Sequence, residues 1–315
     1  MELKYSDTRL YNLKRKRDLK KILNVSSLEN YIEKANICYS PYIDKKAKPR
    51  LIENPNNQLK IIQRRIKKYL FELTYPDNVF SGIPGRSYID NAKYHQNSNY
   101  FIKIDISKFF PNTHREKVYN FYKEKLIMSS DIAEIMTNLS TVNLSKISNN
   151  EVKDFVIKKE IKASNHLPSG SPISCVVSFL ANFEMFNEIE KICLSNNCKV
   201  SFYIDDVTIS STHKIPKTIL RKIKAITKKH FHEINMDKSK TYLANDYKKI
   251  TGCIVSKEKE LIVPNKIKYK IRLLKNNKYT IDKKINSVLG LINTAQIFEK
   301  QKYASLKYDI TKKLT

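Results

Sequence analysis

The stretch that decides the fold reads Lys199-Val200-Ser201-Phe202-Tyr203-Ile204-Asp205-Asp206-Val207-Thr208-Ile209-Ser210. Apolar and polar residues alternate on both sides of the two aspartates, with the period of two that is typical of a β-strand. The stretch therefore predicts a strand, a turn and a second strand, with Asp205 and Asp206 at or near the bend. Adjacent carboxylates raise each other's cost of ionisation, and a divalent cation makes such a pair favourable. A solvated Asp-Asp turn is the alternative interpretation, because aspartate is common in turns.

The composition indicates a globular and strongly basic protein. Of the 315 residues, 41% are hydrophobic and 29% are charged, and 59 Lys and Arg residues against 31 Asp and Glu residues give a net charge of +28. The length is enough for two or three packed subdomains. So large an excess of one charge repels itself and predicts a polyanionic partner. The 19 tyrosines, set among lysines and arginines, suit contacts with RNA or with single strands.

Some classes of protein are excluded by what the sequence lacks. No apolar run of about 18 residues is present, so we expect neither a transmembrane helix nor a membrane partner. Five glycines argue against a Gly-rich dinucleotide-binding loop. The five cysteines form no paired framework, and buried free thiols in a reducing compartment are the simplest interpretation. We therefore expect a cytoplasmic protein.

Periodicity along the rest of the chain predicts an α+β fold. Weak alternation over residues 37–53 predicts a basic β-hairpin that Pro55 ends. Ser171 is expected to cap a helix whose first position is Pro172. Residues 141–166 are rich in Asn and Lys and predict an irregular insertion. Further helices are predicted at residues 8–35 (the second part opening at Ser27), 59–73, 114–140, 173–189 and 216–231, short strands at 249–263, and a Lys-rich helical subdomain from residue 264 onward.

A second carboxylate accompanies a predicted strand. Tyr100–Asp105 is a short apolar run that ends in an aspartate, which predicts a buried strand with a carboxylate at its end. Joining nucleotides uses two divalent ions about 3.5–4 Å apart, one to activate the attacking hydroxyl and one to hold the triphosphate. That chemistry requires carboxylates from separate strands to meet at one edge of a sheet. Asp105, Asp205 and Asp206 are the residues that would supply them.

At these residues the chain resembles a reverse transcriptase. Tyr203-Ile204-Asp205-Asp206 matches the Tyr-x-Asp-Asp motif of that family. Lys103–Pro111 resembles its motif A, and Leu167–Pro172 resembles its motif B, usually Leu-Pro-Gln-Gly-x-Pro. Lys48-x-Arg50-x-Ile52-x-x-Pro55, followed by Leu59-Lys60-x-x-Gln63, resembles its fingers block. Motifs in this order and at these spacings make a chance match improbable.

Two further motifs narrow the resemblance to bacterial retron reverse transcriptases. Asn91-Ala92-Lys93-Tyr94-His95 fits their Asn-Ala-x-x-His motif, and Ile250-Thr251-Gly252 stands where they carry Val-Thr-Gly. The resemblance implies a right-hand polymerase of the α+β class, with fingers, a palm made of an antiparallel sheet backed by helices, and a small helical thumb. The expected boundaries are residues 1–99 for the N-terminal helices and fingers, 100–263 for the palm with its insertion at about 141–166, and 264–315 for the thumb.

The resemblance also assigns roles to single residues. Asp105, Asp205 and Asp206 would be catalytic and would bind two Mg²⁺ ions, which Mn²⁺ could replace. Contacts with the incoming nucleotide are expected from Arg50 and Lys48 at the triphosphate, Phe110 as a steric gate against a ribose 2′-OH, Gly170 beside the nascent pair, Tyr203, and Lys240 or Lys238 as a proton donor. Contacts with RNA are expected from Asn91, His95, Arg64, Arg65 and Lys67. Core packing of Phe110, solvated lysines and a structural role for Asn91 and His95 are the alternatives.

The function that the resemblance implies is RNA-templated DNA synthesis from dNTPs. A 2′-OH of a guanosine in a structured non-coding RNA would prime it, and the product would be a branched RNA–DNA molecule (msDNA). A role in antiphage defence with an effector or toxin protein is implied as well. The alternatives are another bacterial reverse transcriptase, related to group II intron or diversity-generating enzymes, and a catalytically inactive RNA-binding scaffold. Ser169 in place of Gln and Cys175 in place of a frequent Pro depart from the family.

Overall fold

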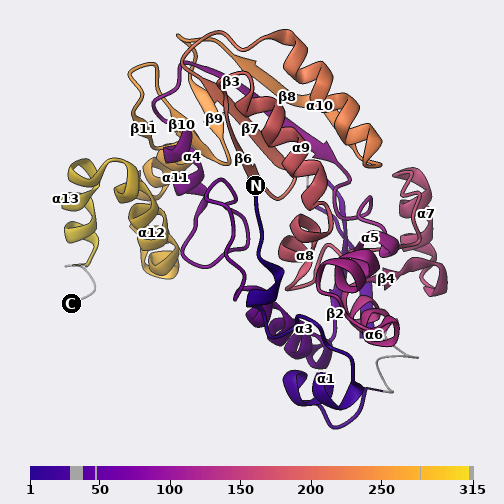
Figure 1. The fold of residues 1–315 in the computed structure, drawn as a ribbon. Helices are drawn as coiled ribbons and strands as arrows, with labels where there is room; N and C mark the ends of the chain where they lie inside the picture. Colours follow the sequence, from indigo (N-terminus) through magenta and orange to yellow (C-terminus); the bar gives the residue numbers. More distant parts are fainter. Residues whose placement is uncertain (29–37, 47, 277, 312–315) are drawn as a thin grey trace.

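A four-stranded antiparallel sheet lies at the centre of the computed structural model, which describes residues 1–28, 38–46, 48–276 and 278–311 (Figure 1). The strand order is β6-β7-β3-β8. β6 (Lys199–Tyr203) and β7 (Asp206–Ser211) form the predicted hairpin, and β3 (Tyr100–Ser107) is the predicted apolar strand. β8 (Glu233–Tyr242) was not predicted, because its mostly exposed residues show no alternation and it forms by pairing with β3.

The helices that pack on this sheet differ from the sequence prediction in two respects. The helix expected over residues 173–189 is two helices, α8 (Ser174–Ala181) and α9 (Phe183–Leu194), because Asn182 between them is not helical (φ −111°, ψ 20°). α9 packs against β6, where the ring centroids of Phe186 and Phe202 lie 4.7 Å apart. α10 (Lys217–Lys229) is the predicted basic helix and packs against α9 and β8.

The start of helix α8 is a further correction. The helix begins at Ser174, and Ile173 occupies the N-cap position without a side-chain cap. The predicted cap at Ser171 is wrong because the helix begins three residues later. The Ser171 hydroxyl accepts from the Ile173 amide at 3.4 Å, before the helix, and donates to the Gln63 side-chain oxygen at 2.9 Å. Residues 167–172 therefore form a loop that is tied to helix α3.

The N-terminal part of the chain carries the predicted hairpin and helix. β1 (Tyr39–Asp44) pairs with β2 (Arg50–Pro55), and α3 (Asn57–Leu70) follows at once. Asn56 caps α3 by accepting from the Leu59 amide at 2.9 Å. Before the hairpin come η1 (Tyr5–Asp7) and α1 (Lys16–Leu23), a shorter helix than expected. The second helical part expected from Ser27 falls mainly on residues 29–37, outside the described residues.

The segment after β3 is helical as predicted, but the insertion that follows is more regular than expected. The helical part comprises α5 (Arg115–Asn120), the π-helical turn η3 (Phe121–Lys125) and α6 (Ser130–Ser140). The prediction of an irregular insertion at 141–166 is wrong, because it contains a helix capped by Asn149, whose side chain accepts from the Val152 amide at 3.2 Å. Its elements are β4 (Val142–Asn143), η4 (Leu144–Lys146), α7 (Asn150–Lys158) and β5 (Asn165–His166).

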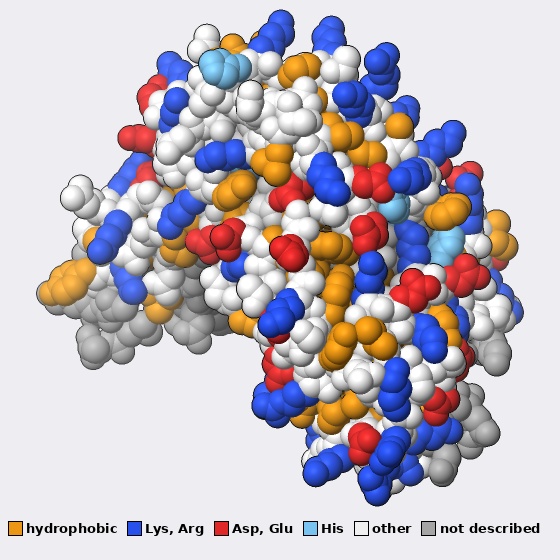
Figure 2. All heavy atoms as spheres, viewed as in Figure 1, with side chains coloured by type: hydrophobic (Ala, Val, Ile, Leu, Met, Phe, Trp, Pro, Cys, Tyr) orange, Lys and Arg blue, Asp and Glu red, His pale blue; other side chains and the backbone are white. Residues whose placement is uncertain are grey.

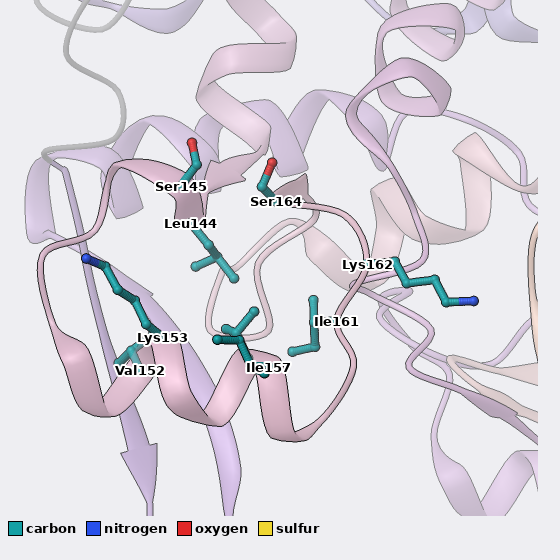
Figure 3. A pocket seen from close by; sticks show the side chains of 9 residues that line it. Leu144, Ser145, Val152, Lys153, Ile157, Ile161, Lys162 and Ser164 are labelled. Carbon is teal, nitrogen blue, oxygen red and sulfur yellow. The ribbon is translucent and has the colours of Figure 1, made fainter.

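The insertion encloses an apolar groove of about 310 Å³. Leu144 and Ile157 point toward one another across it, with Ile161 alongside (Figure 3). None of the three aspartates lines this groove, so it is separate from the candidate site.

Helix α4 and a second, smaller sheet lie beside the central sheet. α4 (Tyr88–His95) packs against β6 and against a small sheet of order β11-β10-β9, made of β9 (Lys248–Ile250), β10 (Cys253–Val255) and β11 (Leu261–Ile262). These strands match the prediction for residues 249–263.

The chain then continues in three helices, as predicted for the part from residue 264. They are α11 (Asn265–Asn276), α12 (Lys278–Phe298) and α13 (Lys300–Thr311). Val263, Val288, Ile292 and Tyr303 belong to a hydrophobic cluster separate from the main core. Among the described residues, no helix combines the length and the apolar character needed to cross a membrane.

Candidate active site

The three aspartates lie at one end of the central sheet. Asp105 on β3 is paired in register with Asp206 on β7, and Asp205 precedes Asp206 in the turn that leaves β6. The Asp205 carbonyl accepts from the Ile106 amide at 2.8 Å, which ties the turn to β3. The pairing of β3 with β7 thus brings together Asp105 and Asp206, which are far apart in the sequence. The sequence predicted that carboxylates from these separate strands would lie at one edge of a sheet.

The turn between β6 and β7 has an unusual backbone. Tyr203 pairs with Asp206, so only Ile204 and Asp205 make the turn. Tight two-residue hairpins of this kind need a positive φ, and Ile204 has φ +58°. A β-branched residue in this region is strained, and such strain persists only where the surroundings hold it, often at functional sites.

Two lysines pair with these aspartates. The Lys103 ammonium lies 3.0 Å from Asp206 Oδ2, and the Lys238 ammonium lies 3.2 Å from Asp105 Oδ1. Lys103 was missed by the sequence analysis, although its position two residues before Asp105 places it on the same face of a strand. Of the two candidate proton donors, the structure brings Lys238 to the aspartates, while Lys240 pairs in register with Lys103 and is exposed.

Asp205 and Asp206 are costly to ionise in this environment. Burial, and then the neighbouring Asp206, raise the pKa of Asp205 to about 6. Burial also raises the pKa of Asp206, and the Lys103 ammonium opposes that rise. Clustered carboxylates with this cost are what a hard divalent cation stabilises. In the described part of the chain, no three His, Cys, Asp or Glu side chains are already gathered as one metal-binding group, but the all-oxygen donor set fits Mg²⁺ or Mn²⁺.

The loop of residues 167–172 is held against strand β2 by a buried glutamate that the sequence analysis missed. The Glu53 carboxylate accepts from the Ser169 amide at 2.8 Å and contacts His166 Nε2 at 2.7 Å. The other ring nitrogen of His166, Nδ1, lies 2.7 Å from the Ala163 carbonyl oxygen. The Ser169 hydroxyl donates to the Leu51 carbonyl at 2.8 Å. Ser169, which replaces the usual Gln, therefore serves to join the loop to β2.

Gly170 is needed for the same contact. A Cβ atom at this position would lie 2.8 Å from the Glu53 carbonyl oxygen and 3.0 Å from its carbon. From the sequence, Gly170 was expected to let the backbone approach the nascent base pair. In the structure the close approach that requires glycine is to the backbone of β2.

The other predicted nucleotide contacts are Phe110, Tyr203, Arg50 and Lys48. Phe110 is half-buried and Phe109 is buried, with their ring centroids 6.1 Å apart. Tyr203 is half-buried opposite Asp206. Arg50 and Lys48 are exposed at the start of β2, and within the described residues no hydrogen bond or ion pair joins them to the aspartates.

Asn91 and His95 are fully buried, so their side chains have no surface to offer an RNA. His95 Nδ1 lies 2.7 Å from the Ser210 hydroxyl, and Nε2 lies 2.7 Å from the Ser201 hydroxyl. The Ser201 hydroxyl donates to the Asn91 oxygen, and the Asn91 amide donates to the Thr251 hydroxyl at 3.2 Å. Since Ser201 gives its proton to Asn91, it accepts from Nε2–H of a neutral ring. The two retron motifs thus form one hydrogen-bonded network, which corrects their expected contact with RNA and agrees with the structural alternative.

The predicted RNA contacts on α3 have different surroundings. Arg64 is exposed. The Arg65 guanidinium donates to the Leu23 and Asn24 carbonyls at 2.6 and 2.9 Å, where it completes the end of α1. The Lys67 ammonium lies over the Phe71 ring at 5.2 Å. Within the described residues, Arg64 is therefore the one of these three whose charged group makes no hydrogen bond, ion pair or ring contact.

The chain is similar to known proteins of one family. Residues 32–274 match the family model of reverse transcriptase (RNA-dependent DNA polymerase). The chain is 30% identical to Retron Se72 reverse transcriptase of Salmonella heidelberg over 53% of its length and 39% of that protein. It is 23% identical to Retron Ec48 reverse transcriptase of Escherichia coli over 87% of its length and 68% of that protein.

A third relative, Retron Ec83 reverse transcriptase of Escherichia coli, is 28% identical over 52% of the chain and 49% of that protein. The matches thus span about two fifths to two thirds of these curated relatives. The matched region contains all three aspartates, the Asn91–His95 motif and Thr251. These relatives are retron reverse transcriptases, and the chain belongs to the reverse transcriptase (RNA-dependent DNA polymerase) family.

Proposed function

We propose that this chain synthesises DNA on an RNA template by two-metal nucleotidyl transfer. The observation that carries the proposal is the position of Asp105, Asp205 and Asp206 at one end of the sheet in a chain of the reverse transcriptase family. A protein that only bound RNA would not need acidic groups there, where their ionisation is costly. A catalytically inactive RNA-binding scaffold is therefore the weaker hypothesis.

The three aspartates would hold two Mg²⁺ ions, for which Mn²⁺ would substitute. When bound, these ions supply Lewis acidity at the attacking hydroxyl and neutralise charge on the triphosphate. Lys103 and Lys238 hold the aspartates in place by ion pairs. Lys238 also presents an ammonium beside the site, which is the group that we propose as proton donor to the leaving pyrophosphate.

The surrounding residues would bind the nucleotide. Arg50 and Lys48 would meet the triphosphate as exposed cations on the β1–β2 hairpin. Phe110, half-buried next to Phe109, would exclude a ribose 2′-OH, and Tyr203 would lie beside the sugar. We propose the same domain boundaries: residues 1–99 for the N-terminal helices and fingers, 100–263 for the palm and 264–315 for the thumb.

The similarity to retron reverse transcriptases suggests a primer and a product for DNA synthesis. We propose that a structured non-coding RNA provides a guanosine 2′-OH as primer, and that the product is a branched RNA–DNA molecule. A defence role with an effector protein is proposed on the same resemblance. A group II intron-like or diversity-generating reverse transcriptase is the second candidate.

Replacement of the paired aspartates tests the polymerase proposal. Asp205→Asn with Asp206→Asn should abolish dNTP incorporation on an RNA template, because neutral amides cannot hold the divalent ions. Folding, followed by circular dichroism, and RNA binding should remain. The matched control is Asp154→Asn with Glu160→Gln, two exposed acidic groups of the insertion. Retained synthesis in the aspartate variant would overturn the metal assignment.

Sequencing of the nucleic acid that copurifies with the protein tests the retron assignment separately. A branched RNA–DNA molecule is the expected result. A linear cDNA would favour the second candidate while leaving the polymerase proposal in place.

A further inference from the structure

Helix α10 carries an exposed face on which every charged residue is basic. Its buried side packs on the core through Ile219, Ile223 and Ile226. The helix contains no acidic residue, and all its cations are exposed, namely Lys217, Arg221, Lys222, Lys224, Lys228 and Lys229.

Most of these cations lack a counter-charge. Lys229 pairs with Glu188 of α9 at 2.8 Å, and Glu188 also accepts from His230 at 3.0 Å. In the part of the chain that the structure describes, no ion pair involves the other five cations of α10. An ordinary solvated helix intersperses both signs and gains from pairs three or four residues apart. Like charges set at the same spacing repel one another, so this face costs stability unless a polyanion covers it.

The cations form a line with a definite direction. Lys217, Arg221, Lys224 and Lys228 recur at intervals of four, three and four residues, which places them along one side of the helix over about 16 Å. α10 follows β7, whose end at Ser211 pairs with Tyr100, and leads into β8, whose start at Glu233 pairs with Ser107. The line therefore runs along the sheet toward the end that carries Asp105. Figure 2 shows Lys and Arg side chains along the upper right edge, where Figure 1 places α10.

We propose that this face of α10 binds the phosphate backbone of a double-stranded RNA segment, outside the catalytic site and leading to it. This inference rests on the proposed function, because the bound RNA would be the one that the polymerase copies or uses as its primer. A duplex suits the face better than a single strand does. Single-strand sites add aromatic side chains on which bases stack, and α10 has none between Lys217 and Lys229. Because the exposed cations lie in a straight line, they can contact the regularly spaced phosphates of a duplex. Such contacts do not distinguish one base from another.

Neutralisation of the line tests the proposal. The variant Lys217→Gln, Arg221→Gln, Lys224→Gln and Lys228→Gln keeps helix propensity, because Lys, Arg and Gln are similar helix formers. The probe is an RNA hairpin with a stem of about 16 base pairs, and its Kd is measured from about 50 to 200 mM salt. If each cation neutralises one phosphate, the slope of log Kd against log salt falls by about 3 to 4. We expect Kd to rise at least about tenfold at the upper salt concentration.

The matched control removes the same charge elsewhere. Lys153→Gln, Lys158→Gln, Lys159→Gln and Lys162→Gln act on exposed lysines of the insertion that are interspersed with Glu151, Asp154 and Glu160. This control should keep most of the slope. An equal loss in both variants would mean that only net charge matters, and an unchanged slope in the α10 variant would mean that another partner or solvent covers the face. Either result overturns the proposal.

Failure of the proposed function would be visible separately. DNA synthesis by the unmodified protein on a short primed RNA is measured in parallel. Its absence would contradict the polymerase proposal, whereas the hairpin binding reports on α10 alone.

Discussion

Gly170 shows how one missing side chain fixes the position of a loop. We expect Gly170→Ala to lower the free energy of unfolding by about 1–3 kcal/mol, the usual cost of overpacking, because its Cβ would meet the Glu53 backbone, which is not a flexible side-chain end. DNA synthesis should fall as well, since the loop would shift away from β2. Urea unfolding and primer extension measure the two effects.

Gly290 in α12 provides the matched control. A Cβ there would meet nothing within 4 Å, so Gly290→Ala should raise stability by up to about 1 kcal/mol through helix propensity. Equal effects of the two substitutions would contradict the role of the contact with Glu53.

His95 makes the protein acid-sensitive. Burial, and then Lys199, lower the pKa of His95 to about 3, whereas an unfolded chain has a pKa of about 6.5. The unfolded state therefore binds more protons as the pH falls, and stability is lost from about pH 6.5 downward, by about 2 kcal/mol at pH 5. His95→Gln should lower stability at pH 7.5 and reduce this loss between pH 7.5 and 5.

Urea unfolding at the two pH values measures the effect. Exposed His213→Gln is the control and should leave the acid sensitivity as it is. If His95→Gln retains the full loss at pH 5, other groups cause it, and buried His232, whose pKa burial lowers to about 2, becomes the first to examine.

Among the elements, the β1–β2 hairpin and the loop of residues 167–172 act as one unit through Glu53. Glu53→Gln leaves an amide that cannot accept from both Ser169 and His166 as a carboxylate does. We expect a loss of about 1–3 kcal/mol in unfolding free energy, the range for a buried hydrogen bond to a charged group.

Glu151→Gln is the control for Glu53→Gln, because Glu151 makes an exposed pair with Lys45 at 2.8 Å and such pairs contribute little. Thermal and urea unfolding would show the difference. Similar small effects in both variants would mean that Glu53 does not hold the hairpin to the loop.

Elements with a hydrophobic pattern of their own were predicted from the sequence. Strand β8, which forms by pairing with β3, was missed. The hairpin around Asp205 and strand β3 alternate or are apolar, so they were predicted, and their meeting at Asp105 followed. Strand β8 has a polar, exposed sequence and exists because β3 offers it an edge, so no local pattern signals it. Glu53 and Lys103 were missed for a related reason, since a buried or paired charge is recognised only when its partner is known.

For the entire chain, the net charge of +28 predicts opposite effects of salt on stability and on binding. Raising KCl from about 0.1 M to 1 M shortens the Debye length from about 10 Å to 3 Å. Self-repulsion is then screened, and we expect Tm to rise by a few degrees. Affinity for RNA should fall steeply over the same range. Differential scanning fluorimetry and RNA titration measure both, and a Tm that falls with salt would contradict a self-repelling fold.

The hydrogen-bonded network of His95 has a consequence for how sequences of this kind diverge. Asn91 and Thr251 lie 160 positions apart, yet one hydrogen bond joins them, and His95 requires the hydroxyls of Ser201 on β6 and Ser210 on β7. These positions should therefore be inherited as a set. A relative that has lost the histidine should also tolerate apolar residues at the two serines. A relative that keeps it should keep both hydroxyls, even where the surrounding sequence has changed beyond recognition.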